Sequence, residues 1–253
     1  MRMHVQATPY RQPGLRWRSK LCGACTRALL LGLCLLTATV VRWIAFAETT
    51  KELCTAGERP VSYDEFGPLD SGNCLILLHG ASGLSLPVYK DQAVFFGQHG
   101  YHVFLPHYFD ATHSAAATVD NYRTWAKVVL DFVGRCHQNP AVQKVFLIGY
   151  SLGASVALAA GSQGAPVTAI AEWYGSLPDD FFYKMRGMPP LLILHGERDT
   201  NIPILNGQQL VKLCEMKQLH CDHHFYPEQA HGFAGKALED ADQRTLSFFS
   251  SIN

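Results

Sequence analysis

From about residue 60 onward, short apolar runs alternate with longer amphipathic runs, and this alternation most limits what the chain can fold into. The apolar runs are continuous, as expected for strands that are covered on both faces. They predict strands at residues 74–78, 102–105, 144–149, 167–172, 190–195 and 221–226. The amphipathic runs predict helices at residues 89–98, 119–137, 152–161, 204–217 and 236–250.

Strands that alternate with helices at this spacing predict an α/β fold with a mostly parallel sheet and helices on both faces. Residues 61–66 are expected to add an antiparallel edge strand that opens the sheet. The short connections and the even composition favour a single domain, which we place at residues 48–253.

The first 47 residues differ from the rest in charge, with seven basic residues and no acidic one. An apolar run at 28–41 precedes the triplet Ala45-Phe46-Ala47, whose small residues suit a signal peptidase. A helix over this run is about 21 Å long, shorter than a bilayer core of about 30 Å. We therefore expect a signal peptide at 1–47 and a periplasmic or extracellular protein. A retained membrane anchor at 28–47 is the alternative.

Beyond residue 47 the chain has 14 basic and 21 acidic residues, a net charge of −7. Nucleic-acid binding needs clustered positive charge, so we do not expect a nucleic-acid partner. An exported protein meets oxidising conditions, in which cysteines pair. The pairings nearest in sequence are Cys54–Cys74 and Cys214–Cys221, which would leave Cys136 free.

The sharpest motif lies where the strand at 144–149 meets the helix at 152–161, and it reads Gly149-Tyr150-Ser151-Leu152-Gly153. A nucleophile elbow needs this arrangement, because the turn is too tight for side chains two residues before and after the serine. Ser151 is therefore the candidate nucleophile, held at the positive end of the following helix.

A serine at its ordinary pKa is a poor nucleophile and needs a base nearby. Hydrolases with this elbow supply an acid and then a histidine further along the chain. Asp199 follows the strand at 190–195 and His231 follows the last strand, so we assign them as acid and base. Glu197 is the rival acid.

The oxyanion formed during acyl transfer needs backbone N–H donors. One is the N–H of Leu152, directly after the nucleophile, and Ala81, in the loop after the strand at 74–78, is the candidate for the second. Four residues at strand ends are expected to line the substrate pocket: His107, Tyr108, Trp173 and Tyr174. The helix between 111 and 137 and the segment 177–188 are the expected lid or pocket walls.

A cluster of metal-ligand residue types at 220–224 does not predict a metal site. Its members are His220, Cys221, Asp222, His223 and His224. Neighbours on a strand point to opposite faces, so only alternate members could share a metal. We expect no metal.

Over roughly residues 60–250 the chain resembles the dienelactone hydrolase family of α/β-hydrolases. The resemblance lies in the elbow, in Gly196-Glu197-Arg198-Asp199 with Ile202-Pro203, in Ala230-His231-Gly232-Phe233, and in Trp173-Tyr174-Gly175. It implies the α/β-hydrolase fold and hydrolysis of small esters or lactones by a nucleophile–His–Asp triad, without a cofactor. The name-giving members have a cysteine nucleophile and a glutamate in the oxyanion loop, where this chain has Ser151 and Gly80.

These departures favour an exported serine esterase that forms an acyl-enzyme on Ser151. Two other classes stay open. A peptidase or acyltransferase would use the same triad, because the residues do not specify the acyl acceptor. A non-catalytic binding module would keep the fold alone. The sequence does not specify the oligomeric state.

Overall fold

A computed structural model describes residues 51–54 and 59–252. The chain divides into a segment Met1–Ile44 and a unit Ala45–Asn253. The predicted signal at 1–47 and the alternative anchor at 28–47 lie outside the described residues, so both stay predictions. Among the helices of the described ranges, none is long and apolar enough to cross a bilayer.

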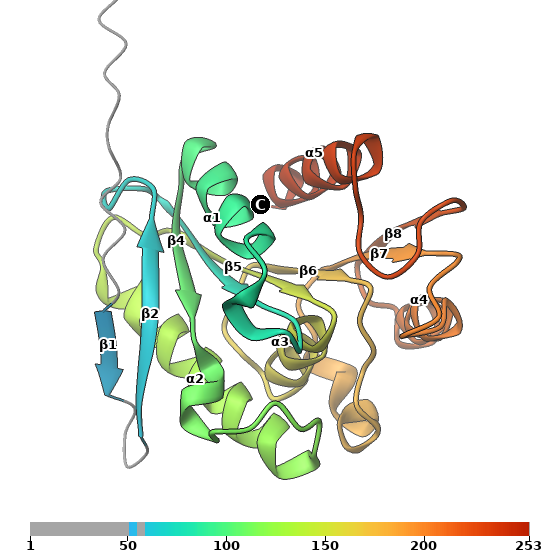
Figure 1. The fold of residues 1–253 in the computed structure, drawn as a ribbon, viewed down its shortest axis with the longest axis horizontal. Coiled ribbons are helices and arrows are strands. Elements are labelled where there is room, and N and C mark those ends of the chain that lie inside the picture. The colour runs from blue at the N-terminus through green and yellow to red at the C-terminus, as the bar shows by residue number, and fades with distance from the viewer. Residues whose placement is uncertain (1–50, 55–58, 253) are drawn as a thin grey trace, which may run out of the picture. The chain divides into compact units, whose positions relative to one another are not determined.

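In the described ranges eight strands form one sheet in the order β1-β2-β4-β3-β5-β6-β7-β8, and all neighbours from β4 through β3 to β8 are parallel (Figure 1). The parallel α/β prediction is therefore confirmed. The strands are β1 (Lys51–Cys54), β2 (Pro60–Phe66), β3 (Asn73–Leu78), β4 (Tyr101–Pro106), β5 (Lys144–Tyr150), β6 (Ala169–Trp173), β7 (Leu191–Gly196) and β8 (Cys221–Tyr226).

The antiparallel strand predicted at 61–66 is present as β2, but its predicted place at the sheet edge is wrong. β2 pairs antiparallel with β4 on one side and with β1 on the other. β1 is four residues long and carries no apolar run, so periodicity could not reveal it. β1 pairs with the backbone N–H and C=O groups of β2 that would stay unpaired if β2 were the edge strand.

Helices cover both faces of the sheet, and Figure 1 shows α1 and α5 together on one side. The helices are α1 (Val88–Gln98), α2 (Val119–Gln138), α3 (Leu152–Ser162), α4 (Leu205–Lys217) and α5 (Lys236–Ser251), with short 3-10 helices η1 (Gly83–Ser85), η2 (Tyr108–Ala111) and η3 (Asp179–Gly187). Along β3, Ile76 packs in the cluster under α2, α3 and α4, whereas Leu75 and Leu77 pack in the cluster under α1 and α5. Alternate residues of a strand point to opposite faces, so the continuous apolar runs build two cores.

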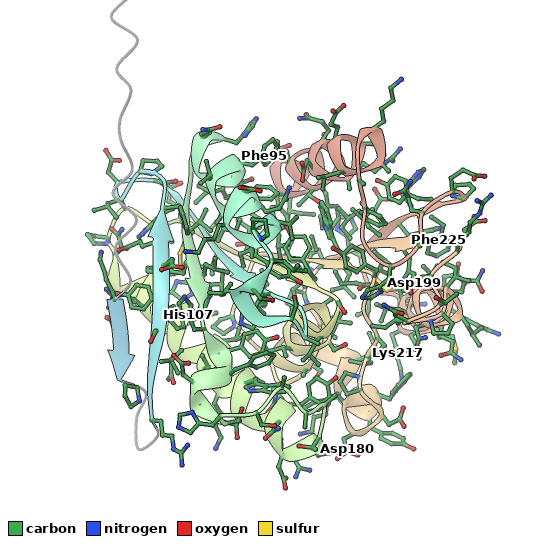
Figure 2. All side chains as sticks on the ribbon, viewed as in Figure 1. Phe95, His107, Asp180, Asp199, Lys217 and Phe225 are labelled. Atoms are coloured by element: carbon green, nitrogen blue, oxygen red, sulfur yellow. A yellow bond between two sulfur atoms is a disulfide. The ribbon has the colours of Figure 1, made fainter. Side chains whose placement is uncertain are left out.

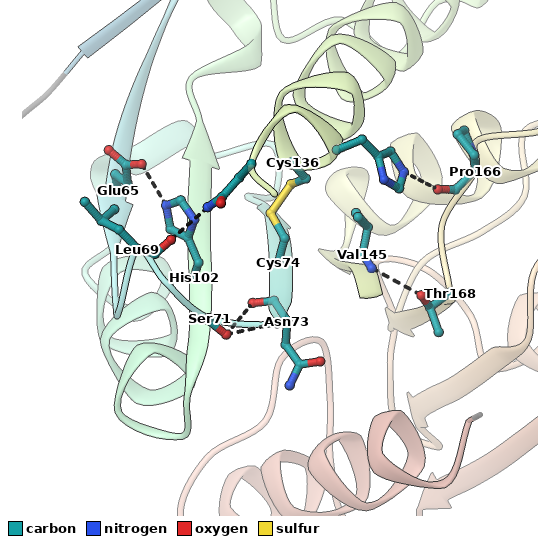
Figure 3. Close-up of a disulfide and its surroundings, with 12 residues drawn as sticks. Glu65, Leu69, Ser71, Asn73, Cys74, His102, Cys136, Val145, Pro166 and Thr168 are labelled. Carbon is teal, nitrogen blue, oxygen red and sulfur yellow. Dashed lines mark hydrogen bonds and ion pairs between the residues drawn. A yellow bond between two sulfur atoms is a disulfide. The ribbon is translucent and has the colours of Figure 1, made fainter. Parts of the chain in front are cut away.

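Two disulfides tie helices to strands. Cys214–Cys221 joins the end of α4 to the start of β8, as predicted. Cys74 on β3 pairs with Cys136 on α2, with Cα atoms 6.0 Å apart (Figure 3). The predicted Cys54–Cys74 bridge and the free Cys136 are therefore wrong. These partners lie 62 residues apart in sequence and meet only because α2 packs across the face of β3.

The parallel strands end at one edge of the sheet, and their register fixes which loops meet there. Leu78 pairs with Gly149, Tyr150 with Trp173, and Gly196 with Tyr226. The oxyanion loop, Ser151 and the loops that carry Asp199 and His231 follow directly after these ends. In open α/β sheets ligands bind at this edge.

Candidate active site

Ser151 lies in a sharp turn between β5 and α3, with φ 54° and ψ −119°. This conformation is strained for any residue other than glycine, and such strain is typical of functional sites. The flanking glycines make the turn feasible. A Cβ on Gly149 would lie 2.3 Å from the carbonyl oxygen of Gly153, and a Cβ on Gly153 would lie 2.2 Å from that of Leu78. The elbow predicted from the motif is present.

Ser151, His231 and Asp199 form one hydrogen-bonded chain. The Oγ of Ser151 lies 2.8 Å from Nε2 of His231, and Nδ1 of His231 lies 2.7 Å from Oδ2 of Asp199. A carboxylate only accepts hydrogen bonds, so Nδ1 carries the proton and Nε2 accepts from the serine hydroxyl. Residues up to 80 positions apart in sequence are thus brought into the geometry of a nucleophile, a base and an orienting acid.

The carboxylate of Asp199 is buried and held by its own loop. Its Oδ1 accepts hydrogen bonds from the backbone N–H groups of Asn201 and Ile202, both at 2.9 Å. This leaves Oδ2 to face His231. His195 lies beneath the loop and donates from Nε2 to the carbonyl oxygen of Ile202 at 2.8 Å. Glu197, the rival acid, is exposed.

The two predicted oxyanion donors lie close to Ser151, the candidate nucleophile. Leu152 is the first residue of α3, and N–H groups in the first turn of a helix have no partner within the helix. Gly80 precedes Ala81 in the loop after β3, and a Cβ on Gly80 would lie 3.3 Å from the Cβ of Ser151. The Gly80–Ala81 peptide is therefore adjacent to Ser151.

A cavity of about 550 Å³ opens above the serine. Its polar lining includes Ser82, Asn201 and the catalytic candidates Ser151 and His231. Its apolar lining comes from Leu86, Val88, Tyr89, Tyr174, Ile202 and Phe233. None of the described residues that line it is Asp, Glu, Lys or Arg. The cavity therefore suits a ligand without charge.

Of the four residues predicted to line the pocket, only Tyr174 does so, with its ring 5.1 Å from that of His231. The side chain of Trp173 is buried in the cluster under α1 and α5, where its Nε1–H donates to Oγ1 of Thr245 at 3.2 Å. His107 is turned toward β2 by the carboxylate of Asp64, 3.2 Å away. Figure 2 shows His107 far from Asp199.

Tyr108 is the fourth, and it is fully buried beneath the oxyanion loop. Its hydroxyl donates to the carbonyl oxygen of His79 at 2.7 Å. A tyrosine at a strand end has the same sequence pattern whether its side chain faces the pocket or the core. Here the hydrogen bond to the His79 carbonyl oxygen holds the hydroxyl in the core.

The predicted lid segments do not line this cavity either. α2 buries Trp125 and Phe132 in the core against α3 and the sheet, and η3 buries Phe181 and Met185 in the same core. The outer wall comes instead from the segment between η1 and α1, through Leu86 and the start of α1. No role was predicted for this segment, since a short loop with scattered apolar residues carries no periodic signal.

Gly196 supports the segment that carries His231, the candidate base, and no such role was predicted from the sequence. It ends β7, and a Cβ there would lie 2.4 Å from the carbonyl oxygen of Gln229 and 2.5 Å from that of Ala230. The backbone that leads to His231 thus rests directly on Gly196. The sequence feature that could have indicated this role is the position of the glycine directly before the Asp199 loop.

We expect Gly196→Ala to lower kcat about 100-fold, because the added methyl group must displace the segment that holds His231 by a good fraction of an ångström. Steady-state kinetics on a folded variant checks this. Gly187→Ala is the matched control, since a Cβ there meets nothing within 4 Å. Wild-type activity in Gly196→Ala would contradict the assigned contact.

Glu172 is a buried carboxyl behind the elbow, and sequence analysis placed it in a strand without a role. It is fully buried on β6, and its Oε2 accepts from the N–H of Gly175 at 2.8 Å. The other oxygen, Oε1, has no hydrogen-bond partner among the described residues. Burial raises the pKa of Glu172 to about 8, so the group is mostly neutral at pH 7. It holds the turn that places Tyr174 against His231.

This raised pKa predicts a loss of stability with rising pH. Between the ordinary pKa of 4.5 and about 8, the folded state holds a proton that the unfolded state has released. Glu172 therefore lowers the free energy of unfolding by up to about 1.4 kcal/mol per pH unit until the pH passes 8. Glu172→Gln keeps the acceptor and cannot ionise. Urea unfolding at pH 7–8.5 should show a smaller decrease in Glu172→Gln than in wild type, and parallel decreases would contradict the prediction.

The histidine-rich strand β8 lies away from the cavity. Cys221 is in a disulfide, and within the described ranges no group of three or more His, Cys, Asp or Glu side chains is placed to bind a metal.

Comparisons with known proteins agree with this geometry. The model of the dienelactone hydrolase family matches residues 67–252. A comparison with curated proteins finds no match. Among solved structures, the dienelactone hydrolase-like promiscuous phosphotriesterase P91, from metagenomic libraries, is 16% identical with a TM-score of 0.70, covering 82% of this chain and 98% of its own.

An esterase from the planctomycete Thermogutta terrifontis, solved with propionate bound, is 16% identical with a TM-score of 0.63, covering 80% of this chain and 93% of its own. The same esterase phosphonylated by cyclosarin has a TM-score of 0.66 at 15% identity, covering 81% of this chain and 94% of its own. These structures show the α/β-hydrolase fold. The family match extends over most of the chain and includes the elbow and both loops, so the chain belongs to the dienelactone hydrolase family.

Proposed function

We propose that the chain is a serine hydrolase that cleaves small, uncharged carboxylic esters or lactones through an acyl-enzyme on Ser151. The observation that carries the proposal is the hydrogen-bonded chain Ser151–His231–Asp199 at the base of an uncharged cavity. Together with membership of a hydrolase family, this arrangement favours acyl transfer over a binding module that kept only the fold.

In the first half of the reaction, the Oγ of Ser151 attacks the carbonyl carbon while Nε2 of His231 takes the hydroxyl proton. The carbonyl oxygen becomes an oxyanion, held by the N–H groups of Leu152 and Ala81. The tetrahedral intermediate then collapses, the bond to the leaving oxygen breaks, and His231 gives its proton to the departing alcohol. Asp199 stabilises the imidazolium throughout.

In the second half, a water molecule attacks the acyl-enzyme and His231 takes its proton. The bond to Oγ breaks, the carboxylic acid leaves, and Ser151 recovers its proton from His231. No electrons are transferred, so the cycle needs no redox partner. In a lactone the leaving alcohol stays attached to the acyl group, and the product is a hydroxy acid.

The uncharged lining supports the substrate class. A carboxylate on the substrate would lose its hydration in a cavity whose lining offers it no Lys or Arg, and an unpaired buried charge is strongly disfavoured. The family's name-giving substrates are lactones, and the esterase of T. terrifontis was solved with propionate. Small neutral acyl groups fit both the lining and this neighbour.

The test uses p-nitrophenyl esters with the full chain. A burst of p-nitrophenol equal to the enzyme concentration, with an acyl adduct in the intact mass, is the expected result for an acyl-enzyme. The mono-p-nitrophenyl ester of adipic acid and its methyl ester are a matched pair, because the first has a free carboxylate where the second has a neutral methyl ester. Release of p-nitrophenol from the methyl ester should have the higher kcat/KM. No hydrolysis by folded protein would contradict the proposal, and equal kcat/KM values would contradict the substrate class alone.

We also propose that the protein is exported, with 1–47 removed. The predicted cleavage motif and the two disulfides, Cys74–Cys136 and Cys214–Cys221, support this, because disulfides persist in oxidising compartments. Expression of the full chain in a secreting host, followed by N-terminal sequencing, should give a product that begins at Glu48. A product that keeps residues 28–47 and sediments with membranes would support the anchor instead.

A further inference from the structure

The ring of His79 is buried beneath the oxyanion loop and fixed from several sides. It stacks on Tyr108 with ring centroids 4.2 Å apart and 12° between the planes, and Phe109 packs edge-on at 4.8 Å. The hydroxyl of Tyr108 also donates to the backbone carbonyl of His79. This ring belongs to neither the hydrogen-bonded triad nor the lining of the cavity.

One hydrogen bond of His79 links it to the loop that follows. Nδ1 of His79 lies 2.9 Å from the carbonyl oxygen of Gly80. A carbonyl oxygen only accepts, so Nδ1 is the protonated nitrogen. Burial lowers the pKa of His79 to about 4, so the ring is neutral at neutral pH and this single tautomer satisfies the bond.

The bond acts on the peptide that carries the predicted oxyanion donor. In a trans peptide the C=O of one residue and the N–H of the next point to opposite sides of the plane. The C=O of Gly80 faces the buried ring of His79, so the N–H of Ala81 faces the opposite side, toward the cavity that Ala81 and Ser151 line. A flipped peptide would lose this hydrogen bond, together with the one that the Gly80 carbonyl accepts from the N–H of Gly83 at 3.1 Å, and would put a carbonyl oxygen where the oxyanion forms.

We propose that His79, stacked on Tyr108, is a positioning residue that holds the Gly80–Ala81 peptide in the orientation that completes the oxyanion hole. This inference rests on the proposed serine hydrolase function. The two residues have distinct parts in it. Tyr108 immobilises His79 by stacking on its ring and by the hydrogen bond from its hydroxyl to the His79 carbonyl oxygen, and the His79 Nδ1–H fixes the Gly80–Ala81 peptide. Tyr108, predicted as a pocket residue, therefore acts from beneath the site.

Two substitutions of His79 separate its hydrogen bond from its bulk. His79→Asn places an amide N–H close to the position of Nδ1, whereas His79→Leu fills the space without a donor. We expect kcat of His79→Leu to fall 10²- to 10³-fold, the cost of losing one oxyanion donor, with KM changed less than about threefold. His79→Asn should recover most of that loss.

A second readout is specific to the oxyanion hole. A trifluoromethyl ketone that matches the best ester forms a tetrahedral adduct on an active serine and places an oxyanion in the hole. Its inhibition constant should rise across the His79 variants in proportion to the fall in kcat/KM, as expected for a transition-state analogue. Phe132→Leu, in the core away from the cavity, is the control for lost stability and should leave both quantities unchanged.

Tyr108→Phe keeps the stacked ring and removes the bond to the His79 carbonyl, so it tests the proposal even where His79→Leu does not fold. We expect kcat to fall roughly tenfold, in line with the loss of one hydrogen bond.

Wild-type kcat in folded His79→Leu, or in Tyr108→Phe, would overturn the inference, as would a His79→Asn variant as slow as His79→Leu. A wild-type chain without esterase activity would overturn the proposed function and this inference together. The esterase activity of the wild-type chain is therefore measured before that of any variant.

Discussion

Ser151→Ala is expected to lower kcat for a p-nitrophenyl ester by about 10⁶-fold, the largest effect of any substitution in this chain. The hydroxyl oxygen is the atom that forms the acyl bond, and no other group in the site can replace it. KM should change little, because the apolar wall and the oxyanion donors still bind the ester. Activity that remains reflects the oxyanion hole and substrate binding alone.

Ser162→Ala is the matched control for this substitution. Ser162 lies at the other end of α3, and its hydroxyl donates within the helix to the carbonyl oxygen of Ala159. Stopped-flow kinetics on both variants, with circular dichroism to establish folding, should show full activity only in Ser162→Ala. A folded Ser151→Ala variant with more than about one hundredth of wild-type kcat would contradict the assignment of the nucleophile.

Asp199→Asn should have the second largest effect, a fall in kcat of about 10⁴-fold. The asparagine still accepts at Oδ1 from the N–H groups of Asn201 and Ile202, so the loop keeps its shape. Its amide group, however, favours donation to Nδ1 of His231. The imidazole then carries its proton on Nε2 and can no longer accept the serine proton.

Glu197→Gln serves as the control, because Glu197 lies in the same loop and is exposed. It should keep wild-type kcat, and Asp199→Asn should unfold at nearly the wild-type urea concentration. The reverse pattern, a slow Glu197→Gln and an active Asp199→Asn, would make Glu197 the orienting acid.

The sheet could be predicted closely because its strands are buried on both faces. Each of the six predicted parallel strands is present within two residues of its expected bounds. The antiparallel β1 was missed, since it is short and polar and depends on pairing with β2 for its conformation.

The Ser151–His231–Asp199 chain could be predicted because each residue has a local signal tied to a strand end. The pocket wall could not. Trp173 and Tyr174 are adjacent aromatic residues with the same signal, and only the positive φ of Tyr174, 47°, turns its ring toward His231. The role of Gly196 comes from its contact with the segment at Gln229 and Ala230, which no single stretch of sequence encodes. His79 and Glu172 bond to their own sequence neighbours, Gly80 and Gly175, and it is the fold that buries them there.

The same limit explains the disulfide that was predicted wrongly. Sequence distance favoured Cys54 as the partner of Cys74, but the packing of α2 on β3 brings Cys136 to it. Cys214–Cys221 was found because a turn between a helix and the next strand keeps sequence neighbours close in space.

The central claim is that Ser151 is a nucleophile activated by His231 and Asp199, and covalent labelling tests it most directly. The full chain is treated with a fluorophosphonate, and the adduct is measured by intact mass and located by peptide mapping. If Ser151 is that nucleophile, we expect one adduct per chain, on Ser151, absent from Ser151→Ala and much slower to form in Asp199→Asn. A folded wild-type chain that forms no adduct, or one on another residue, would contradict it.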